Sequence, residues 1–203
     1  MAGIPPERQA SSGSASDLDS TAQALGNEST PVPRELQRIV LTGFMGAGKS
    51  TIGRLLAQRL GWRFVDVDDA IEAAQEATIA AIFAKNGESW FRQLEHETIQ
   101  RLLGSDRLVL ALGGGAIEDD RTRNLLLQKA ETRLVHLHVS LDTVLLRCRG
   151  TEDLRPILQD QANLENRYKR RLPLYREAHL TIAADSLLPE AIVSAILAEV
   201  ETV

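Results

Sequence analysis

The stretch G-F-M-G-A-G-K-S-T at positions 43–51 limits the fold of this chain more than any other part of the sequence. It follows the apolar residues Ile39, Val40 and Leu41, which predict a strand, and it leads into a helical pattern. Glycines let the backbone turn tightly, so that successive N–H groups point inward at an anion. The helix that follows adds the positive end of its dipole to the same anion. An anion-binding loop between a strand and a helix is therefore predicted.

The spacing Gly43-x4-Gly48-Lys49-Ser50 is that of a P-loop, which holds the phosphates of a nucleotide. Lys49 would place a compact cation between the β- and γ-phosphates, and the Ser50 hydroxyl can ligate Mg²⁺. The alternative is a glycine-rich turn with a chance lysine, which the strand before it and the helix after it disfavour. A nucleoside triphosphate site is predicted. Its expected ATP-binding residues are Gly46, Ala47, Gly48, Lys49, Ser50 and Thr51.

The composition is that of an ordinary globular domain, and it narrows the possible function classes. The chain has 203 residues, a net charge of −5 and a pI near 5.4, which argues against a broad nucleic-acid-binding surface. Cys148 is the only cysteine, so an internal disulfide and a thiolate-rich metal site are excluded. No apolar run is long enough to span a bilayer, and the N-terminus lacks the pattern of a secretory signal. We expect a cytoplasmic protein that binds neither nucleic acid nor membrane.

Residues 1–36 differ in composition from the rest of the chain and hold six serines, four prolines and three glycines. They show almost no apolar periodicity, which is typical of a segment that cannot bury a core. A plastid transit peptide is the alternative, but such peptides are poor in acidic residues, and five occur here. We expect a disordered extension over residues 1–36 and one folded domain over residues 37–203.

From Leu36 onward, strand-like and helix-like stretches alternate. The predicted strands are 38–42, 63–67, 108–112, 133–139 and 180–183. The predicted helices are 49–60, 70–75, 88–103, 121–130, 142–147, 161–177 and 190–200. Gly61 follows the first helix as a glycine at a helix end often does, and Ser140 is expected to cap another helix. This alternation predicts the α/β class, a parallel sheet with helices on both faces.

A group of acidic residues lies in F-V-D-V-D-D at positions 64–69. On a strand, Asp66 and Asp68 would share one face, because side chains alternate along it. They would then lie at the carboxyl end of a parallel strand, where open α/β sheets bind ligands. The alternative is that Asp68 or Asp69 caps the following helix. We favour a functional role for Asp66 with Asp68, and the capping role for Asp69.

With these motifs placed, the chain resembles the shikimate kinase family over about residues 37–200. The resemblance is carried by G-F-M-G-A-G-K-S-T, F-V-D-V-D-D-A-I-E, F-R-Q-L-E at 91–95, L-G-G-G-A at 112–116, R-P-I-L at 155–158 and R-L-P-L-Y at 171–175. It implies a P-loop NTPase fold of the nucleoside-monophosphate-kinase type, with a five-stranded parallel sheet and a lid at about 149–158. It also implies a monomer that uses ATP and Mg²⁺ to convert shikimate to shikimate 3-phosphate and ADP, a step toward chorismate and the aromatic amino acids.

The resemblance also assigns roles to individual residues. Asp68 matches the acid that binds the ring hydroxyls and serves as candidate base. Arg92 and Arg171 match the arginines that hold the substrate carboxylate, and Gly114 matches a backbone donor to the substrate. On the nucleotide side, Lys49 belongs to the P-loop, Arg155 matches a lid arginine over the phosphates, Arg149 an adenine-side arginine, and Ser50 with Asp66 the magnesium side. The lid is about one residue shorter than the family pattern.

Some of these assignments also follow from the chemistry of the substrate. A small anionic polyol needs planar cationic groups for its carboxylate and acceptors for its hydroxyls. Arg92 has an orienting partner in Glu95, three residues further along the predicted helix. Taken alone, Arg92 and Arg171 would be ordinary solvated arginines. Two other functions stay open, a related kinase that acts on gluconate and a module that binds ATP without catalysis.

Overall fold

The computed structural model describes Met1, residues 36–148 and residues 161–201. The predicted extension and the predicted lid, with Arg149 and Arg155, lie outside the described residues apart from Met1 and Leu36. The strands are β1 (Arg38–Thr42), β2 (Arg63–Asp66), β3 (Leu108–Ala111), β4 (Thr132–His138) and β5 (Leu180–Ala183). The helices are α1 (Lys49–Leu60), α2 (Val67–Gln75), α3 (Ile79–Leu102), the 3₁₀ turn η1 (Ala116–Glu118), α4 (Asp120–Gln128), α5 (Leu141–Arg147), α6 (Gln161–Tyr175) and α7 (Pro189–Glu201).

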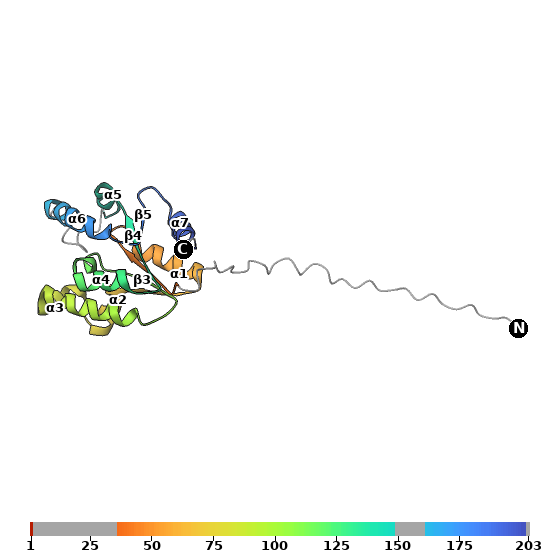
Figure 1. The fold of residues 1–203 in the computed structure, drawn as a ribbon, viewed down its shortest axis with the longest axis horizontal. Coiled ribbons are helices and arrows are strands. Elements are labelled where there is room, and N and C mark those ends of the chain that lie inside the picture. Colours follow the sequence, from red (N-terminus) through yellow and green to blue (C-terminus); the bar gives the residue numbers. More distant parts are fainter. Residues whose placement is uncertain (2–35, 149–160, 202–203) are drawn as a thin grey trace.

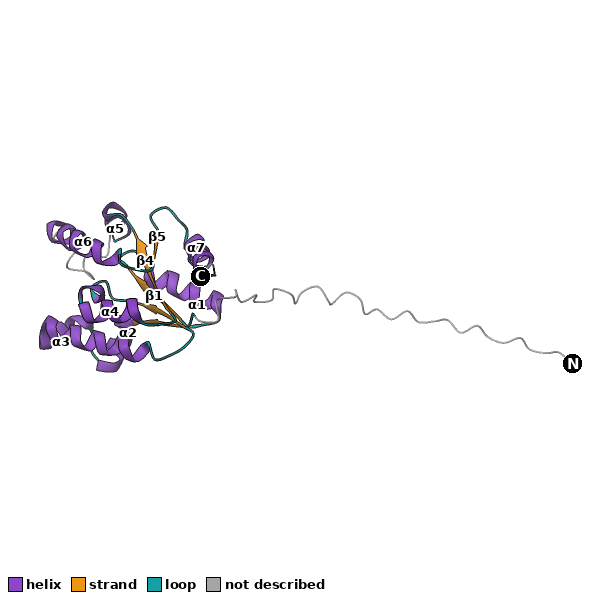
Figure 2. Ribbon diagram, viewed as in Figure 1, coloured by secondary structure: helices purple, strands orange, loops and turns teal. Residues whose placement is uncertain are grey.

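The five strands form one parallel sheet in the order β2-β3-β1-β4-β5. The predicted α/β class with a five-stranded parallel sheet is confirmed. Helices α1 and α7 pack together on one face of the sheet, and α3 and α4 lie on the other (Figure 1). Figure 2 shows the strands enclosed between these two layers of helices. Within the described part of the chain, no helix is both long and apolar enough to cross a membrane.

The central strands form the core of the domain. All residues of β1 and β3 are buried, as the apolar runs predict, because β1 is paired on both sides and both faces of the sheet are covered. The edge strands β2 and β5 are only partly buried. Since parallel strands end at the same edge of a sheet, the loops after β1, β2 and β3 meet there.

The P-loop joins β1 to α1 as predicted. Gly48 caps α1 with φ at 90°, a left-handed conformation that side chains other than glycine rarely adopt. At the other end of α1, Gly61 is also left-handed, and its N–H donates to the carbonyl oxygens of Ala57 and Gln58, which confirms the predicted helix end. The Ser140 side chain accepts from the N–H of Thr143 at the start of α5, so that predicted cap is also confirmed.

Three predictions about the acidic segment and α3 were wrong. Strand β2 ends at Asp66, and α2 begins at Val67, so Asp66 and Asp68 do not share a strand face. Asp66, not Asp69, caps α2, because its carboxylate accepts from the N–H of Asp68. Helix α3 begins at Ile79, nine residues before the predicted start, since Gly87 interrupts it with non-helical backbone angles without ending it.

Candidate active site

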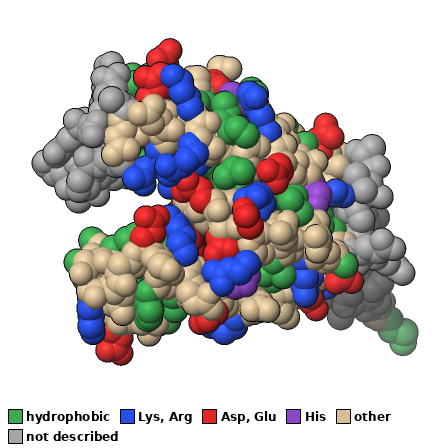
Figure 3. All heavy atoms as spheres, turned by 60° about the vertical axis from the view of Figure 1, so that its left-hand side comes forward, with side chains coloured by type: hydrophobic (Ala, Val, Ile, Leu, Met, Phe, Trp, Pro, Cys, Tyr) green, Lys and Arg blue, Asp and Glu red, His purple; other side chains and the backbone are tan. Residues whose placement is uncertain are grey.

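A cleft of about 780 Å³ opens at the carboxyl edge of the sheet. Its lining includes the P-loop, the glycine run after β3 and the predicted site residues Asp66, Asp68, Arg92 and Arg171. In the space-filling view the cleft is a deep notch, with basic and acidic side chains on both walls (Figure 3). Residues that are distant in the sequence therefore share one cavity with Lys49, as the sequence hypothesis required.

At the nucleotide end of the cleft, the P-loop places its polar groups close to α2. The ammonium of Lys49 donates to the carbonyl oxygens of Gly43 (2.9 Å) and Phe44 (3.3 Å). The hydroxyl of Ser50 donates to the carboxylate of Asp66 at 2.6 Å. Among the described residues, no group of three or more His, Cys, Asp or Glu side chains could hold a metal ion. The adjacent Ser50 and Asp66 nevertheless fit Mg²⁺, which takes one or two protein oxygens and completes its shell with phosphate oxygens and water.

Asp68 lies in the first turn of α2 and faces the same cleft. Burial raises the pKa of Asp68, and the nearby carboxylate of Asp66 raises it further, while Lys49 opposes the change. A carboxylate with a raised pKa is a better proton acceptor than one in water. The side chain is therefore suited to general-base chemistry.

Arg92 enters the cleft from α3 and is held by two glutamates. Its Nη1 lies 2.6 Å from Glu95 Oε2, and its Nη2 lies 3.3 Å from Glu88 Oε1. The predicted Arg92–Glu95 pair is thus confirmed. Burial raises the pKa of Glu95 to about 7, although Arg92 lowers it, and Asp68 adds to the increase. Asp68, Glu95 and Arg92 are electrostatically linked.

The glycine run after β3 fits between these side chains. A Cβ built on Gly113 would lie 2.6 Å from Asp68 Oδ1 and 2.9 Å from Glu95 Oε1. A Cβ on Gly115 would collide with the guanidinium of Arg92. At two of the three positions a larger residue would collide, because side chains of the cleft pack directly against the backbone there.

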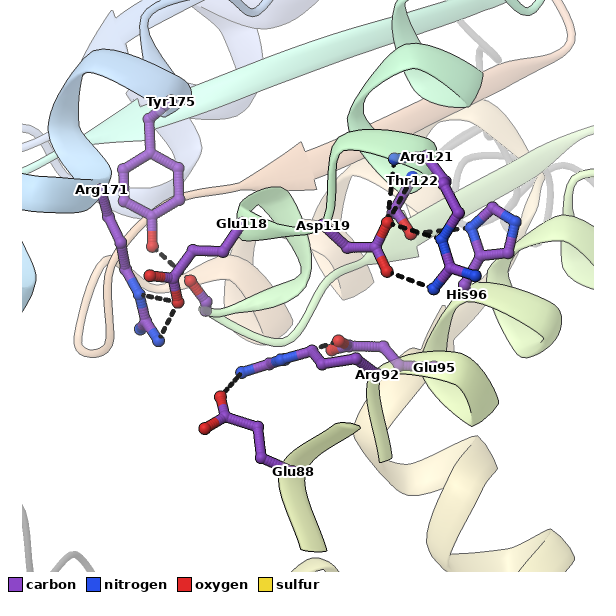
Figure 4. Close-up of polar contacts among 11 residues, drawn as sticks. Glu88, Arg92, Glu95, His96, Glu118, Asp119, Arg121, Thr122, Arg171 and Tyr175 are labelled. Carbon is purple, nitrogen blue, oxygen red and sulfur yellow. Dashed lines mark hydrogen bonds and ion pairs between the residues drawn. The ribbon is translucent and has the colours of Figure 1, made fainter. Parts of the chain in front are cut away.

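Arg171 enters from α6 and is almost completely buried, unlike the exposed Lys169 and Arg170 beside it. Its Nε and Nη2 lie 2.8 and 2.6 Å from Glu118 Oε2. One helical turn further on, the Tyr175 hydroxyl donates to the carbonyl oxygen of Gly114 at 2.5 Å. Figure 4 shows Arg171 and Arg92 approaching the same space from α6 and α3. The reading of Arg171 as a solvated arginine is wrong.

Two residues that support this wall, Glu118 and Tyr175, were given no role from the sequence, although Tyr175 ends the motif R-L-P-L-Y. Tyr175 also stacks on the buried ring of His136, with centroids 5.1 Å apart. The four-residue spacing of Arg171 and Tyr175 could have revealed that both occupy one face of a helix. No local signal connects Glu118 to Arg171, because the two lie on separate elements.

Comparisons with known proteins place the chain among shikimate kinases. A family model described as shikimate kinase matches residues 45–201. The shikimate kinase of Persephonella marina is 40% identical over 166 residues, which cover 81% of this chain and 99% of that protein. The structure of Acinetobacter baumannii shikimate kinase in complex with shikimate matches with a TM-score of 0.76 and 38% identity, over 82% of this chain and 94% of that chain. A gluconokinase from Sinorhizobium meliloti shares the fold at a TM-score of 0.53 and 19% identity, over 84% of this chain and 96% of that chain.

Proposed function

The chain belongs to the shikimate kinase family, and from this premise we propose that it transfers the γ-phosphoryl group of ATP to the 3-hydroxyl of shikimate. The products are ADP and shikimate 3-phosphate, an intermediate on the route to chorismate and the aromatic amino acids. The observation that carries the proposal is the convergence of Asp68, Arg92 and Arg171 with Lys49 in one cleft. A nucleotide loop alone would need neither arginine.

The substrate end of the cleft has the groups that a carboxylated polyol requires. The guanidinium groups of Arg92 and Arg171 would hold the carboxylate, since planar forks pair with carboxylates through two hydrogen bonds. The backbone of Gly114 would face the ring, and Asp68 would accept a hydrogen bond from the 3-hydroxyl. This arrangement turns the hydroxyl toward the nucleotide end.

The reaction is an in-line displacement at phosphorus. The 3-oxygen of shikimate forms a bond to the γ-phosphorus as the bond to the β,γ-bridging oxygen breaks, and the hydroxyl proton passes to Asp68. The N–H groups of the P-loop and the ammonium of Lys49 would stabilise the charge on the phosphate oxygens, because phosphoryl transfer depends mainly on positioning and electrostatics. Arg155, in the predicted lid, is proposed to add positive charge there, and Arg149 to contact the adenine side.

We further propose that Ser50 and Asp66 hold Mg²⁺ with the nucleotide. The hydroxyl and carboxylate are 2.6 Å apart and belong to the hard oxygen ligands that Mg²⁺ prefers. When bound, the ion would neutralise charge on the phosphate oxygens. The cytoplasmic location, the monomeric state and the disorder of residues 1–36 stay predictions.

A coupled ADP-release assay tests the proposed function. The full-length protein is supplied with ATP and Mg²⁺ together with shikimate, with gluconate or with no acceptor. We expect turnover with shikimate only. Turnover with gluconate alone would assign a different kinase activity. If calorimetry shows that ATP binds but neither acceptor is turned over, the non-catalytic module would be favoured.

A further inference from the structure

Glu118, at the end of η1, joins two arginines of α6. Its Oε2 accepts from Nε and Nη2 of Arg171, while its Oε1 lies 2.9 Å from Nε and 2.8 Å from Nη2 of Arg170. Glu118 does not belong to the lining of the cleft. Its carboxylate is mostly covered, whereas the side chain of Arg170 is exposed. The contact with the buried Arg171 therefore connects Glu118 to the site.

Glu118 contacts only one edge of the Arg171 guanidinium. A guanidinium can pair with a carboxylate through its Nε/Nη2 edge or through its Nη1/Nη2 edge. Glu118 occupies the Nε/Nη2 edge of Arg171. The Nη1 atom points toward the glycine run, 3.6 Å from where a Cβ of Gly114 would lie. The edge that Glu118 leaves uncovered therefore lies beside Gly114 and the Tyr175 hydroxyl, within the lining of the cleft.

The contacts with Arg171 and Arg170 also keep the Glu118 carboxylate ionised. Burial alone would raise the pKa of Glu118, but hydrogen bonds and charge from Arg171 and then Arg170 lower it below its ordinary value. The carboxylate stays ionised near neutral pH and pairs strongly with Arg171. Glu118 thus holds the side chain of Arg171 in one rotamer before any ligand arrives, and preorganisation of this kind lowers the entropy cost of binding.

We propose that Glu118 is a positioning residue. By binding the Nε/Nη2 edge of Arg171, it orients the Nη1/Nη2 edge of that arginine to receive the carboxylate of the acid substrate. Glu118 sets the affinity for shikimate without touching it. The inference rests on the proposed function. The opposite possibility is that Glu118 competes with the substrate carboxylate for Arg171, in which case its removal would tighten binding.

The test compares Glu118→Ala, Glu118→Gln and a matched control, Glu177→Ala, in the full-length enzyme. Glu177 is also a glutamate paired with an arginine, Arg123 at 2.8 Å, but it lies outside the cleft lining. For Glu118→Ala we expect KM for shikimate to rise about tenfold, because a charged hydrogen bond that orients Arg171 is lost. The kcat and KM for ATP should stay within about twofold of wild type. Glu118→Gln keeps one acceptor for Arg171 and should restore part of the affinity, and the control should match wild type.

A double-mutant cycle with Arg171→Ala shows whether Glu118 acts through that arginine. In the Arg171→Ala background, Glu118→Ala should cause no further rise in KM. The proposal is overturned if KM for shikimate is unchanged or lower in Glu118→Ala or, should that variant not fold, in Glu118→Gln. Additive effects in the cycle would also overturn it. A wild-type enzyme that does not phosphorylate shikimate would instead refute the proposed function itself.

Discussion

Replacing Gly113 with alanine tests whether the glycine run determines the position of Asp68. The added Cβ would lie 2.6 Å from Asp68 Oδ1, whereas ordinary contact begins near 3.4 Å. The carboxylate would have to retreat by about 0.8 Å, because the buried surroundings leave the new methyl group no other space. Glu95 Oε1, at 2.9 Å from the same Cβ, restricts movement on that side.

A displacement of this size predicts a large loss of rate. Misplacing a catalytic group by about 1 Å can cost about 100-fold in turnover, so we expect kcat of Gly113→Ala to fall about 100-fold, or about 2.7 kcal/mol. KM for ATP should change less than about twofold, since the P-loop is untouched. The measurement is steady-state ADP release with shikimate as the acceptor, together with a thermal unfolding curve to confirm that the variant is folded.

Gly114→Ala is the matched comparison in the same run. Its Cβ would be at least 3.6 Å from the nearest atoms, which is ordinary contact, so Asp68 should keep its position and kcat should stay near wild type. Its added methyl group should instead raise KM for shikimate, because the Gly114 backbone is proposed to face the ring. A folded Gly113→Ala enzyme with wild-type kcat would refute the reasoning that close packing against Gly113 positions Asp68.

Other expectations follow from the same site. Asp68→Asn should lower kcat by about 10²- to 10⁴-fold while calorimetric ATP affinity is unchanged, and equal turnover would remove its role as base. Arg171→Ala should raise KM for shikimate about 100-fold, because the truncation removes the buried partner of the substrate carboxylate. An unchanged KM would contradict the proposed contact between Arg171 and that carboxylate. Burial lowers the pKa of His136 to about 4, so the unfolded chain binds a proton that the folded protein does not, and stability is lost as pH falls from about 6.5 toward 4. Denaturant titrations of wild type and His136→Gln should differ in this window by on the order of 2 kcal/mol, and parallel curves would show that His136 does not contribute.

Local patterns were enough to predict the P-loop and the sheet. A strand of apolar residues, a glycine-rich turn and a helix are each specified by neighbours in sequence, so β1, the loop and α1 lie where expected. The secondary structure around Asp66 was harder to predict, since D-V-D-D is compatible with an alternating strand and with a helix N-terminus. The hydrogen bond from the N–H of Asp68 to Asp66 decides for the helix, and hydrophobic periodicity carries no information about it.

The support of the site depends on contacts between distant segments. The family resemblance placed Arg92 and Arg171, and the short spacing to Glu95 predicted its pairing with Arg92. The partner of Arg171 could not be found in this way, because Glu118 reaches it from another element, and the run of basic residues around Arg171 looks solvated. A residue such as Glu118 is visible only once η1 and α6 are placed side by side.

The two arginine walls of the cleft come from α3 and α6, which different halves of the chain supply (Figure 4). An acid bridging them would bind only when both halves are in place, so its binding free energy is added wholly to the native state. Ligand at 100 times its dissociation constant would raise resistance to denaturant by about 2.7 kcal/mol. Availability of the metabolite would then govern how long the enzyme survives proteolysis, as well as how fast it works.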